Sequence, residues 1–251
     1  MFKYLLSFLL IVFTVVQVTG QEAPETPEKS KFKAFLVNVG YGFHMPGGDM
    51  KDRFGSNSSA GLQIEFIYQG YFAGIEGDFL FGGTVKTDVL APLRTPEGAL
   101  IGDDFEFAIP RLSERGFYTG GYVGKVFPVL KNHPRSGLRV SLGLGLLSHK
   151  INIADEAGTL VQLQGEYKKG YDRLTNGLAT RQFIGYHHFS RNRLINFYAG
   201  FEFTQGFTKS RRDFNFDTME VDTNSRLDAF YGFRIGWTLP IFIGEGDEYF
   251  Y

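Results

Sequence analysis

The chain has no cysteine and almost no net charge. Without cysteine it forms no disulfide framework and no thiolate metal site, and it offers no residue for a cysteine-linked lipid anchor. Lysine and arginine number 26 and aspartate and glutamate 27, which gives a formal net charge of −1. Nucleic-acid-binding domains usually carry a basic excess, so this balance argues against nucleic acid as a partner.

Long hydrophobic runs are absent beyond the N-terminus. Lys3 is followed by an apolar run over 5–18 and a small-residue ending at Gly20, the pattern of a cleaved signal peptide over 1–20. An N-terminal membrane anchor is the alternative, although the run is shorter than the about 20 residues that a spanning helix needs. Residues 21–32 are polar and contain proline, so we expect a periplasmic leader there.

Aromatic residues and glycine are abundant, with 27 Phe, 13 Tyr and 32 Gly, which favours an all-β protein. Apolar and polar residues alternate in eight segments, as in strands with two unlike faces. The clearest segment, 138–146, places leucine and valine at every even position. The pattern predicts an eight-stranded antiparallel up-and-down transmembrane β-barrel over 33–240, with a periplasmic tail over 241–251.

The connections between these segments alternate in length. Short connections stand at 69–70, 131–136 and 190–193. The long ones are 45–58, 82–115, 150–175 and 208–225. Outer-membrane barrels have short periplasmic turns and long extracellular loops, so we expect the long stretches outside the cell and both termini in the periplasm.

One face of the alternating segments is rich in glycine and in charge, and we expect it to line the barrel interior. Space inside eight strands is scarce, which favours glycine, and buried charges persist when they are paired. The predicted glycines include Gly40, Gly42, Gly61, Gly74, Gly121, Gly143, Gly145, Gly200, Gly232 and Gly236. The predicted lumen charge network has four acids and four bases: Glu65, Glu76, Asp78, Lys125, Arg139, Arg181, Glu202 and Arg234.

The opposite face is apolar and aromatic, and we expect it to face lipid. A soluble barrel of the lipocalin type, with its apolar face inside, is the alternative. The predicted girdle of aromatic residues near the short-turn end consists of Tyr68, Tyr71, Tyr186 and Trp237.

Two segments carry particular expectations about their faces. In the segment 116–129, Tyr118, Tyr122 and Val126 are expected on the outer face. The segment 176–189 is ambiguous. Its best register turns Leu178, Ile184 and Tyr186 outward and Arg181 inward, but also turns Gln182 outward, so a bulge is an open alternative. With a different register, Arg181 and His187 would exchange roles with their neighbours.

Several sequence runs carry a family resemblance. They are PGGD at 46–49, DRFG at 52–55, GIEGDFLFG at 74–82, KGYDRLTNG at 169–177, NFYAGFEF at 196–203 and DEYFY at 247–251. Across nearly the whole mature chain, the sequence resembles a family of small outer-membrane β-barrels of Bacteroidota-type bacteria. The resemblance implies the fold and the location, and it assigns no activity.

His188, Ser190 and Glu202 form the sharper of two weak catalytic candidates. Barrel lipid A deacylases carry a His-x-Ser pair with a glutamate on the next strand, and a serine nucleophile needs a histidine base within reach. Arg191 departs from that family's pattern, the segment is predicted at the periplasmic turn, and the predicted register turns His188 and Glu202 to opposite faces. An interfacial histidine–phenylalanine belt is the structural alternative.

His44 and Asp228 form the second candidate, because both should face inward on the first and last strands, which are neighbours in a closed barrel. A histidine–carboxylate pair could activate water, or it could be a structural pair at the rim. Neither the glycine run 120–125 nor the charged stretch around 211–222 has the spacing of a P-loop or an EF-hand, so we expect no cofactor and no metal site.

The sequence therefore predicts a non-enzymatic structural or interaction protein of the cell outer membrane. Its expected partners are outer-membrane lipid or lipopolysaccharide and other envelope proteins, through the long loops, with 21–32 and 241–251 facing the periplasm. An outer-leaflet lipid-modifying hydrolase, similar to a lipid A deacylase, is one alternative. A narrow channel is the other, although side chains fill the interior of eight strands.

Overall fold

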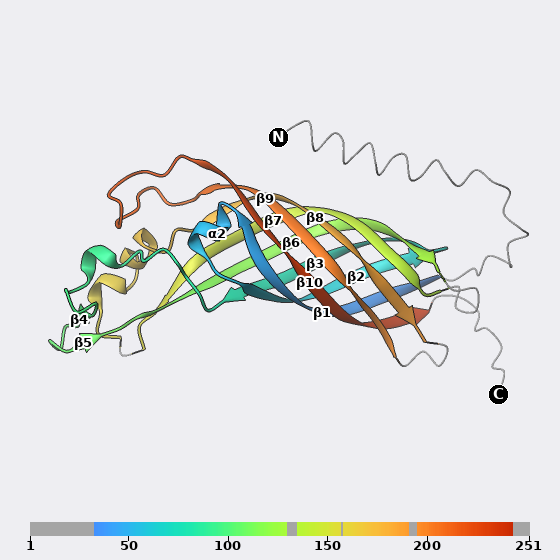
Figure 1. Cartoon of the computed structure of the whole chain (residues 1–251), viewed down its shortest axis with the longest axis horizontal. Coiled ribbons are helices and arrows are strands. Elements are labelled where there is room, and N and C mark those ends of the chain that lie inside the picture. The colour runs from blue at the N-terminus through green and yellow to red at the C-terminus, as the bar shows by residue number, and fades with distance from the viewer. Residues whose placement is uncertain (1–32, 130–134, 157, 191–194, 243–251) are drawn as a thin grey trace, which may run out of the picture. The chain divides into compact units, whose positions relative to one another are not determined.

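The computed structural model describes residues 33–129, 135–156, 158–190 and 195–242 (Figure 1). The predicted signal peptide, the predicted leader and residues 243–251 of the predicted tail lie outside these residues. Within the described part of the chain, no helix is both long enough and apolar enough to cross a membrane.

Eight antiparallel strands close into a barrel, which confirms the fold predicted from the alternation. The order around the ring is β1-β10-β9-β8-β7-β6-β3-β2, so consecutive barrel strands are neighbours and the last strand closes on the first. The barrel strands are β1 (Lys33–Gly48), β2 (Asn57–Tyr68), β3 (Tyr71–Gly82), β6 (Arg111–Pro128), β7 (Gly137–Ala154), β8 (Thr175–Phe189), β9 (Asn196–Ser210) and β10 (Ser225–Phe242).

The smaller elements lie in the long connections. β4 (Leu100–Ile101) and β5 (Phe107–Ala108) pair with each other as a separate hairpin. The short helical turns are α2 (Met50–Arg53), η1 (Ala91–Leu93), η2 (Val161–Leu163) and η3 (Tyr167–Gly170). Figure 1 shows β4 and β5 beyond the long-loop end of the barrel.

The strands run farther than the sequence predicted. β6 begins at Arg111 and β7 ends at Ala154, and these two residues pair with each other inside what we predicted as loops. β10 likewise continues past residue 240, where Phe242 pairs with Ala34. The loop boundaries were wrong because polar residues at the loop end of a strand resemble loop sequence, whereas the paired backbone continues there.

The outer face of the barrel is apolar. Ile75, Leu144 and Phe207 are exposed to 65%, 61% and 62%. Tyr68, Tyr71, Tyr186 and Trp237 also lie on this face and are exposed to between 36% and 60%. A soluble barrel would bury its apolar face, so this arrangement is the opposite of the lipocalin type.

The interior is filled in three layers. Near the short turns, an apolar layer contains Ala34, Leu36, Ile67, Phe72, Tyr122, Val126 and Phe189. Near the long loops, a second apolar layer includes Met50, Phe54, Leu80, Tyr118, Leu147 and Phe230. Charged side chains fill the middle. Glycine supplies the space, since a Cβ at Gly40 would lie 2.7 Å from the Tyr198 hydroxyl and 2.9 Å from Arg234 Nη2.

Strand β6 has the opposite orientation to the predicted one. Tyr118, Tyr122 and Val126 are buried inside the barrel, whereas Gly121 and Lys125 face outward. Both faces of this strand contain glycine and aromatic residues, so the alternation did not distinguish them. The register with β3 and β7 decides, because it places Lys125 beside Tyr71 and Val140 on the outer face.

Strand β8 pairs without interruption with both neighbours, so the bulge considered from the sequence is absent from the described strand. Arg181 and His187 are buried inside. Leu178, Ile184 and Tyr186 face outward as predicted, and Gln182 faces outward with them.

Candidate functional site

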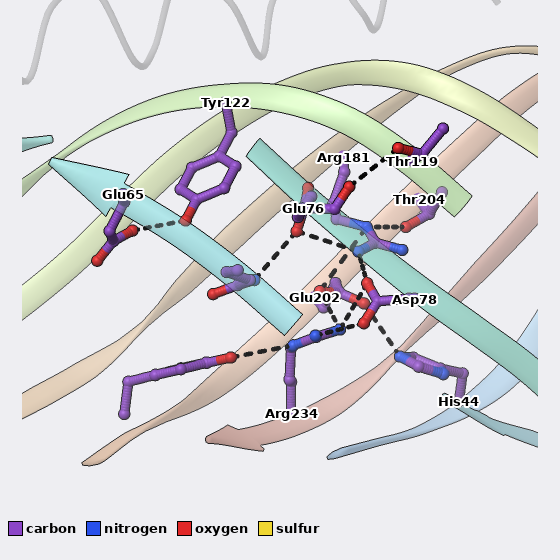
Figure 2. A network of polar contacts seen from close by, with 12 residues as sticks. His44, Glu65, Glu76, Asp78, Thr119, Tyr122, Arg181, Glu202, Thr204 and Arg234 are labelled. Atoms are coloured by element: carbon purple, nitrogen blue, oxygen red, sulfur yellow. Dashed lines mark hydrogen bonds and ion pairs between the residues drawn. The ribbon is translucent and has the colours of Figure 1, made fainter. Parts of the chain in front are cut away.

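The middle of the barrel contains a buried charge network centred on Asp78 (Figure 2). Arg234 Nη2 lies 2.6 Å from Asp78 Oδ1, and Arg181 pairs with the other oxygen of the same carboxylate. Arg234 Nη1 also lies 3.3 Å from Glu202 Oε2, and His44 Nε2 lies 3.2 Å from Glu202 Oε1. The network therefore connects β1, β3, β8, β9 and β10 across the lumen.

A second group lies closer to the short turns. Arg139 donates to both oxygens of Glu65, at 2.8 and 2.5 Å, and Tyr122 donates to the same carboxylate at 2.7 Å. Gln63, two residues before Glu65 on β2, donates to Glu76 of the central network at 3.0 Å. A guanidinium that binds a carboxylate through two parallel hydrogen bonds is among the strong pairs in proteins.

Seven of the eight predicted network residues lie inside: Glu65, Glu76, Asp78, Arg139, Arg181, Glu202 and Arg234. The prediction for Lys125 is wrong. Its ammonium lies outside the barrel, donates to the Tyr71 hydroxyl at 2.8 Å and sits 4.2 Å from the centre of that ring. Four acids thus face three arginines in the middle of the barrel, and His44 lies against one of the acids.

The mouth at the long-loop end has a polar cluster that the sequence analysis missed. Arg53, from α2, donates to both oxygens of Asp228 at 3.1 Å. His149 Nε2 lies 2.8 Å from Asp228 Oδ2, and Thr208 donates to the same oxygen at 2.5 Å. Arg53 stands in a loop that folds back into the barrel, where strand alternation gives no signal. The run 52–55 was noted only as part of the resemblance.

The predicted catalytic groups do not assemble. His44 contacts Glu202, whereas Asp228 contacts Arg53 and His149, because the register places Gly48 and not His44 opposite Asp228.

His188 faces outward, with its ring 5.2 Å from that of Phe197, whereas Glu202 is buried inside. The backbone of Ser190 is held by the Asn196 side chain at 3.0 Å.

A cavity of about 10 Å³ lies between the two charged groups, lined by side chains that include Glu76, Arg139 and Glu202. That volume suits about one water molecule. Within the described residues, no group of three or more histidine and carboxylate side chains is arranged to hold a metal ion.

The described parts of two long connections, 83–110 and then 155–156 with 158–174, are folded and pack on the extended ends of β6 and β7; we call this unit the loop lobe. Its buried side chains pack with the end of β7 and with Tyr118 and Leu147 of the barrel in one apolar core, to which the lobe contributes Val89, Leu90, Leu100, Leu160 and Leu163 and β7 contributes Ile151 and Ile153. Arg212, from the β9–β10 connection, donates to both oxygens of Asp172 at 2.8 and 2.6 Å. This hydrogen bonding raises the pKa of the Arg212 guanidinium.

The β4–β5 hairpin at the tip of the loop lobe presents an apolar surface. Ile101, Phe105, Phe107 and Ile109 are exposed to 51%, 91%, 69% and 80%. Asp103, Asp104 and Glu106 alternate with them along the chain. Phe105 has a φ of 63°, a left-handed conformation that is uncommon for a bulky side chain. We call residues 101–109 the apolar hairpin.

Comparisons with known proteins give no family. No protein-family model matches the chain, and no curated protein matches it. Two solved structures that it resembles are of Ail, the attachment invasion locus protein of Yersinia pestis, one of them in complex with the heparin analogue sucrose octasulfate. Their sequence identities are 10% and 9% and their TM-scores 0.38 and 0.39, over 82% and 83% of this chain and 99% of each Ail chain.

Proposed function

We propose that this chain is a non-enzymatic interaction protein of the outer membrane, which presents the apolar hairpin to a protein partner outside the cell. The observation that carries the proposal is the high exposure of Phe105 and Ile109 on a loop lobe whose buried side chains share one core with the mouth of the barrel. An exposed apolar patch of this kind is typical of a protein–protein contact. The acidic residues of the hairpin favour a partner with a basic rim around an apolar groove.

The outer-membrane location rests on the outer surface of the barrel. Exposed leucine, isoleucine and phenylalanine side chains cover the strands, as a lipid-facing band requires. The long loops then lie outside the cell and the short turns in the periplasm. The finer assignment to a family of Bacteroidota-type bacteria rests on the sequence runs alone.

The strain in the hairpin supports a role in binding. A bulky residue in the left-handed region costs of order 1–3 kcal/mol and persists where structure or function demands it. Phe105 makes no buried contact that would offset this cost, because it is 91% exposed. Retention of an exposed aromatic residue in a strained turn is what a binding surface requires.

The test is a pull-down of the tagged protein from native outer membranes in gentle detergent, with mass spectrometry of the bound proteins. We expect a partner that is lost from Phe105→Ser/Ile109→Ser. The matched control is Val161→Ser/Tyr167→Ser, which removes two exposed side chains elsewhere on the loop lobe, with exposures of 53% and 66%, and should retain the partner. Absence of any partner, or equal retention by both variants, would refute the proposal.

We further propose that phosphate groups of outer-leaflet lipopolysaccharide bind at Arg115 and Lys150. These two bases are direct cross-strand partners on β6 and β7, and like charges in that position are unfavourable without an anion between them. They stand just beyond the exposed Phe117 and Leu146 of the apolar band. Lys150 lies 3.8 Å from Asp172, but that carboxylate is already bound by Arg212.

The lipid proposal is tested by measuring the lipopolysaccharide retained per barrel after a detergent wash. Arg115→Gln/Lys150→Gln should retain less than the wild-type protein. Lys125→Gln is the matched control, because Lys125 lies on the same face of β6 at the opposite end of the barrel. Equal losses from both variants, or no loss from the double variant, would contradict the assignment.

The geometry favours neither of the two alternatives, a narrow channel and a lipid-modifying hydrolase. A channel needs a continuous path, whereas apolar layers fill both ends of the lumen, so we expect no stepwise conductance in planar bilayers. A lipid-modifying hydrolase needs a histidine within reach of a nucleophile, and His188 is separated from Glu202 by the barrel wall. Removal of the gene should therefore leave the lipid A acylation pattern unchanged.

A further inference from the structure

Three polar side chains point outward from the middle of the apolar face of β8 and β9. Thr180 Oγ1 donates to Gln205 Oε1 at 2.9 Å, and Gln205 Nε2 donates to Gln182 Oε1 at 3.0 Å. We call these three residues the amide ladder. Gln182 stands at the midpoint of β8, between the inward-facing Arg181 and Phe183.

Exposed apolar side chains surround the amide ladder. Along β8 and β9 it is flanked by Leu178, Ile184, Phe203 and Phe207, and across β7 it is flanked by Leu142. The exposures of these side chains run from 40% at Phe203 to 62% at Phe207. The ladder is therefore a polar island at hydrocarbon depth, where lipid offers no hydrogen bonds.

The hydrogen bonds within the amide ladder use only some of its donors and acceptors. A carboxamide has two N–H donors and an oxygen with two lone pairs. Gln182 Oε1 accepts one hydrogen bond, and no described residue accepts one from Gln182 Nε2. Next to Gln205, the paired positions on β10 and β1 are the small residues Ala229 and Gly47, so few side-chain atoms project from the barrel there. Small residues let another backbone approach closely within a membrane.

We propose that the amide ladder is the contact between two copies of this chain in the membrane. A carboxamide complements itself, because each Gln182 can donate its N–H to the oxygen of the other while still accepting from Gln205. A twofold axis along the membrane normal places the same residue of both copies at the same depth. A different partner would need a matching polar group at that depth, whereas a second copy supplies it by symmetry.

The test is photocrosslinking in cells that express two differently tagged copies of the full chain. A benzophenone amino acid at Leu142, directly opposite Gln182 on β7, should give a product that carries both tags. The same probe at Ile75 on β3, across the barrel from β9, should give none. Gln182→Leu should lower the yield from the Leu142 probe by about tenfold, the effect of losing hydrogen bonds of this kind in a membrane.

Ile184→Ala is the matched control, because it removes apolar bulk from the next outward position of β8 and leaves the ladder intact. Its yield should stay close to that of the wild-type protein. The heat-dependent electrophoretic mobility of a folded barrel checks that each variant is inserted. The proposal is overturned if the Leu142 probe captures a different protein or nothing, if Ile75 crosslinks equally, or if Gln182→Leu has no effect. Loss of the loop-lobe partner would leave these outcomes unchanged, so the two proposals fail separately.

Discussion

Replacing Arg234 with methionine tests whether the interior charges are coupled as the distances imply. The guanidinium lies 2.6 Å from Asp78 Oδ1 and 3.3 Å from Glu202 Oε2, and its side chain is fully buried. Arg234→Met keeps the length and most of the packing of the side chain, but it leaves two buried carboxylates with Arg181 as their shared arginine.

Breaking a buried ion pair by removing one partner costs about 3–5 kcal/mol, because a buried charge is left uncompensated. Lys125→Met is the matched control. It removes a base from the same barrel, but on the outer face, where a pair is worth about 0–1 kcal/mol. We therefore expect Arg234→Met to lower the free energy of unfolding by several times as much as Lys125→Met does.

The assay is urea unfolding of the barrel refolded in lipid vesicles. The single tryptophan, Trp237, is half-exposed on the outer face of β10 and reports the loss of lipid contact. Adding Asp78→Asn to Arg234→Met removes one of the two carboxylate charges left without Arg234. The double variant should therefore lose less unfolding free energy than the sum of the losses in the two single variants. Equal effects of Arg234→Met and Lys125→Met, or strict additivity in the cycle, would refute the coupled network.

Three further changes test other parts of the structure. Gly40→Ala should destabilise the barrel by about 1–3 kcal/mol, since the new Cβ would meet an interior hydroxyl and a guanidinium. Gly121→Ala on the outer face, where the new Cβ would lie 3.7 Å from the Gly74 carbonyl oxygen, should be neutral or stabilising, and equal urea midpoints of the two variants would contradict this. Arg53→Met releases the mouth contact with Asp228, so hydrogen exchange should rise in the β1–β2 loop and stay low in the strands. Phe105→Asn relieves the left-handed strain and should protect the hairpin from protease while weakening partner capture; capture at the wild-type level would count against the binding role.

Much of the barrel could be predicted because a strand that separates lipid from a packed interior must alternate. In β7, leucine and valine on one side and glycine, serine and Arg139 on the other leave one orientation. The inward position of Glu65, Glu76, Asp78 and Arg181 follows from the same rule, since a charge facing lipid is costly.

The rest depended on contacts between distant segments. β6 has aromatic residues on both faces, so its orientation came from pairing with β3 and β7. The mouth cluster needed a loop to return into the lumen and bring Arg53 to Asp228. Gln182 looked like a sign of a bulge because a glutamine facing lipid is unusual, and its partner Gln205 lies on another strand.

The histidines show why residue types alone did not locate a function. His44 and His149 each lie against a carboxylate, the arrangement that general base catalysis uses. Here each pair joins two strands that are not neighbours in the barrel. His44 is buried in the charge network, and His149 is buried in the mouth cluster with Arg53 of α2. A catalytic pair must meet a substrate, whereas both of these pairs are buried among the described residues of the barrel. We therefore expect the interior pairs to hold neighbouring segments of the barrel together, and we expect binding to use the outer surface and the loops.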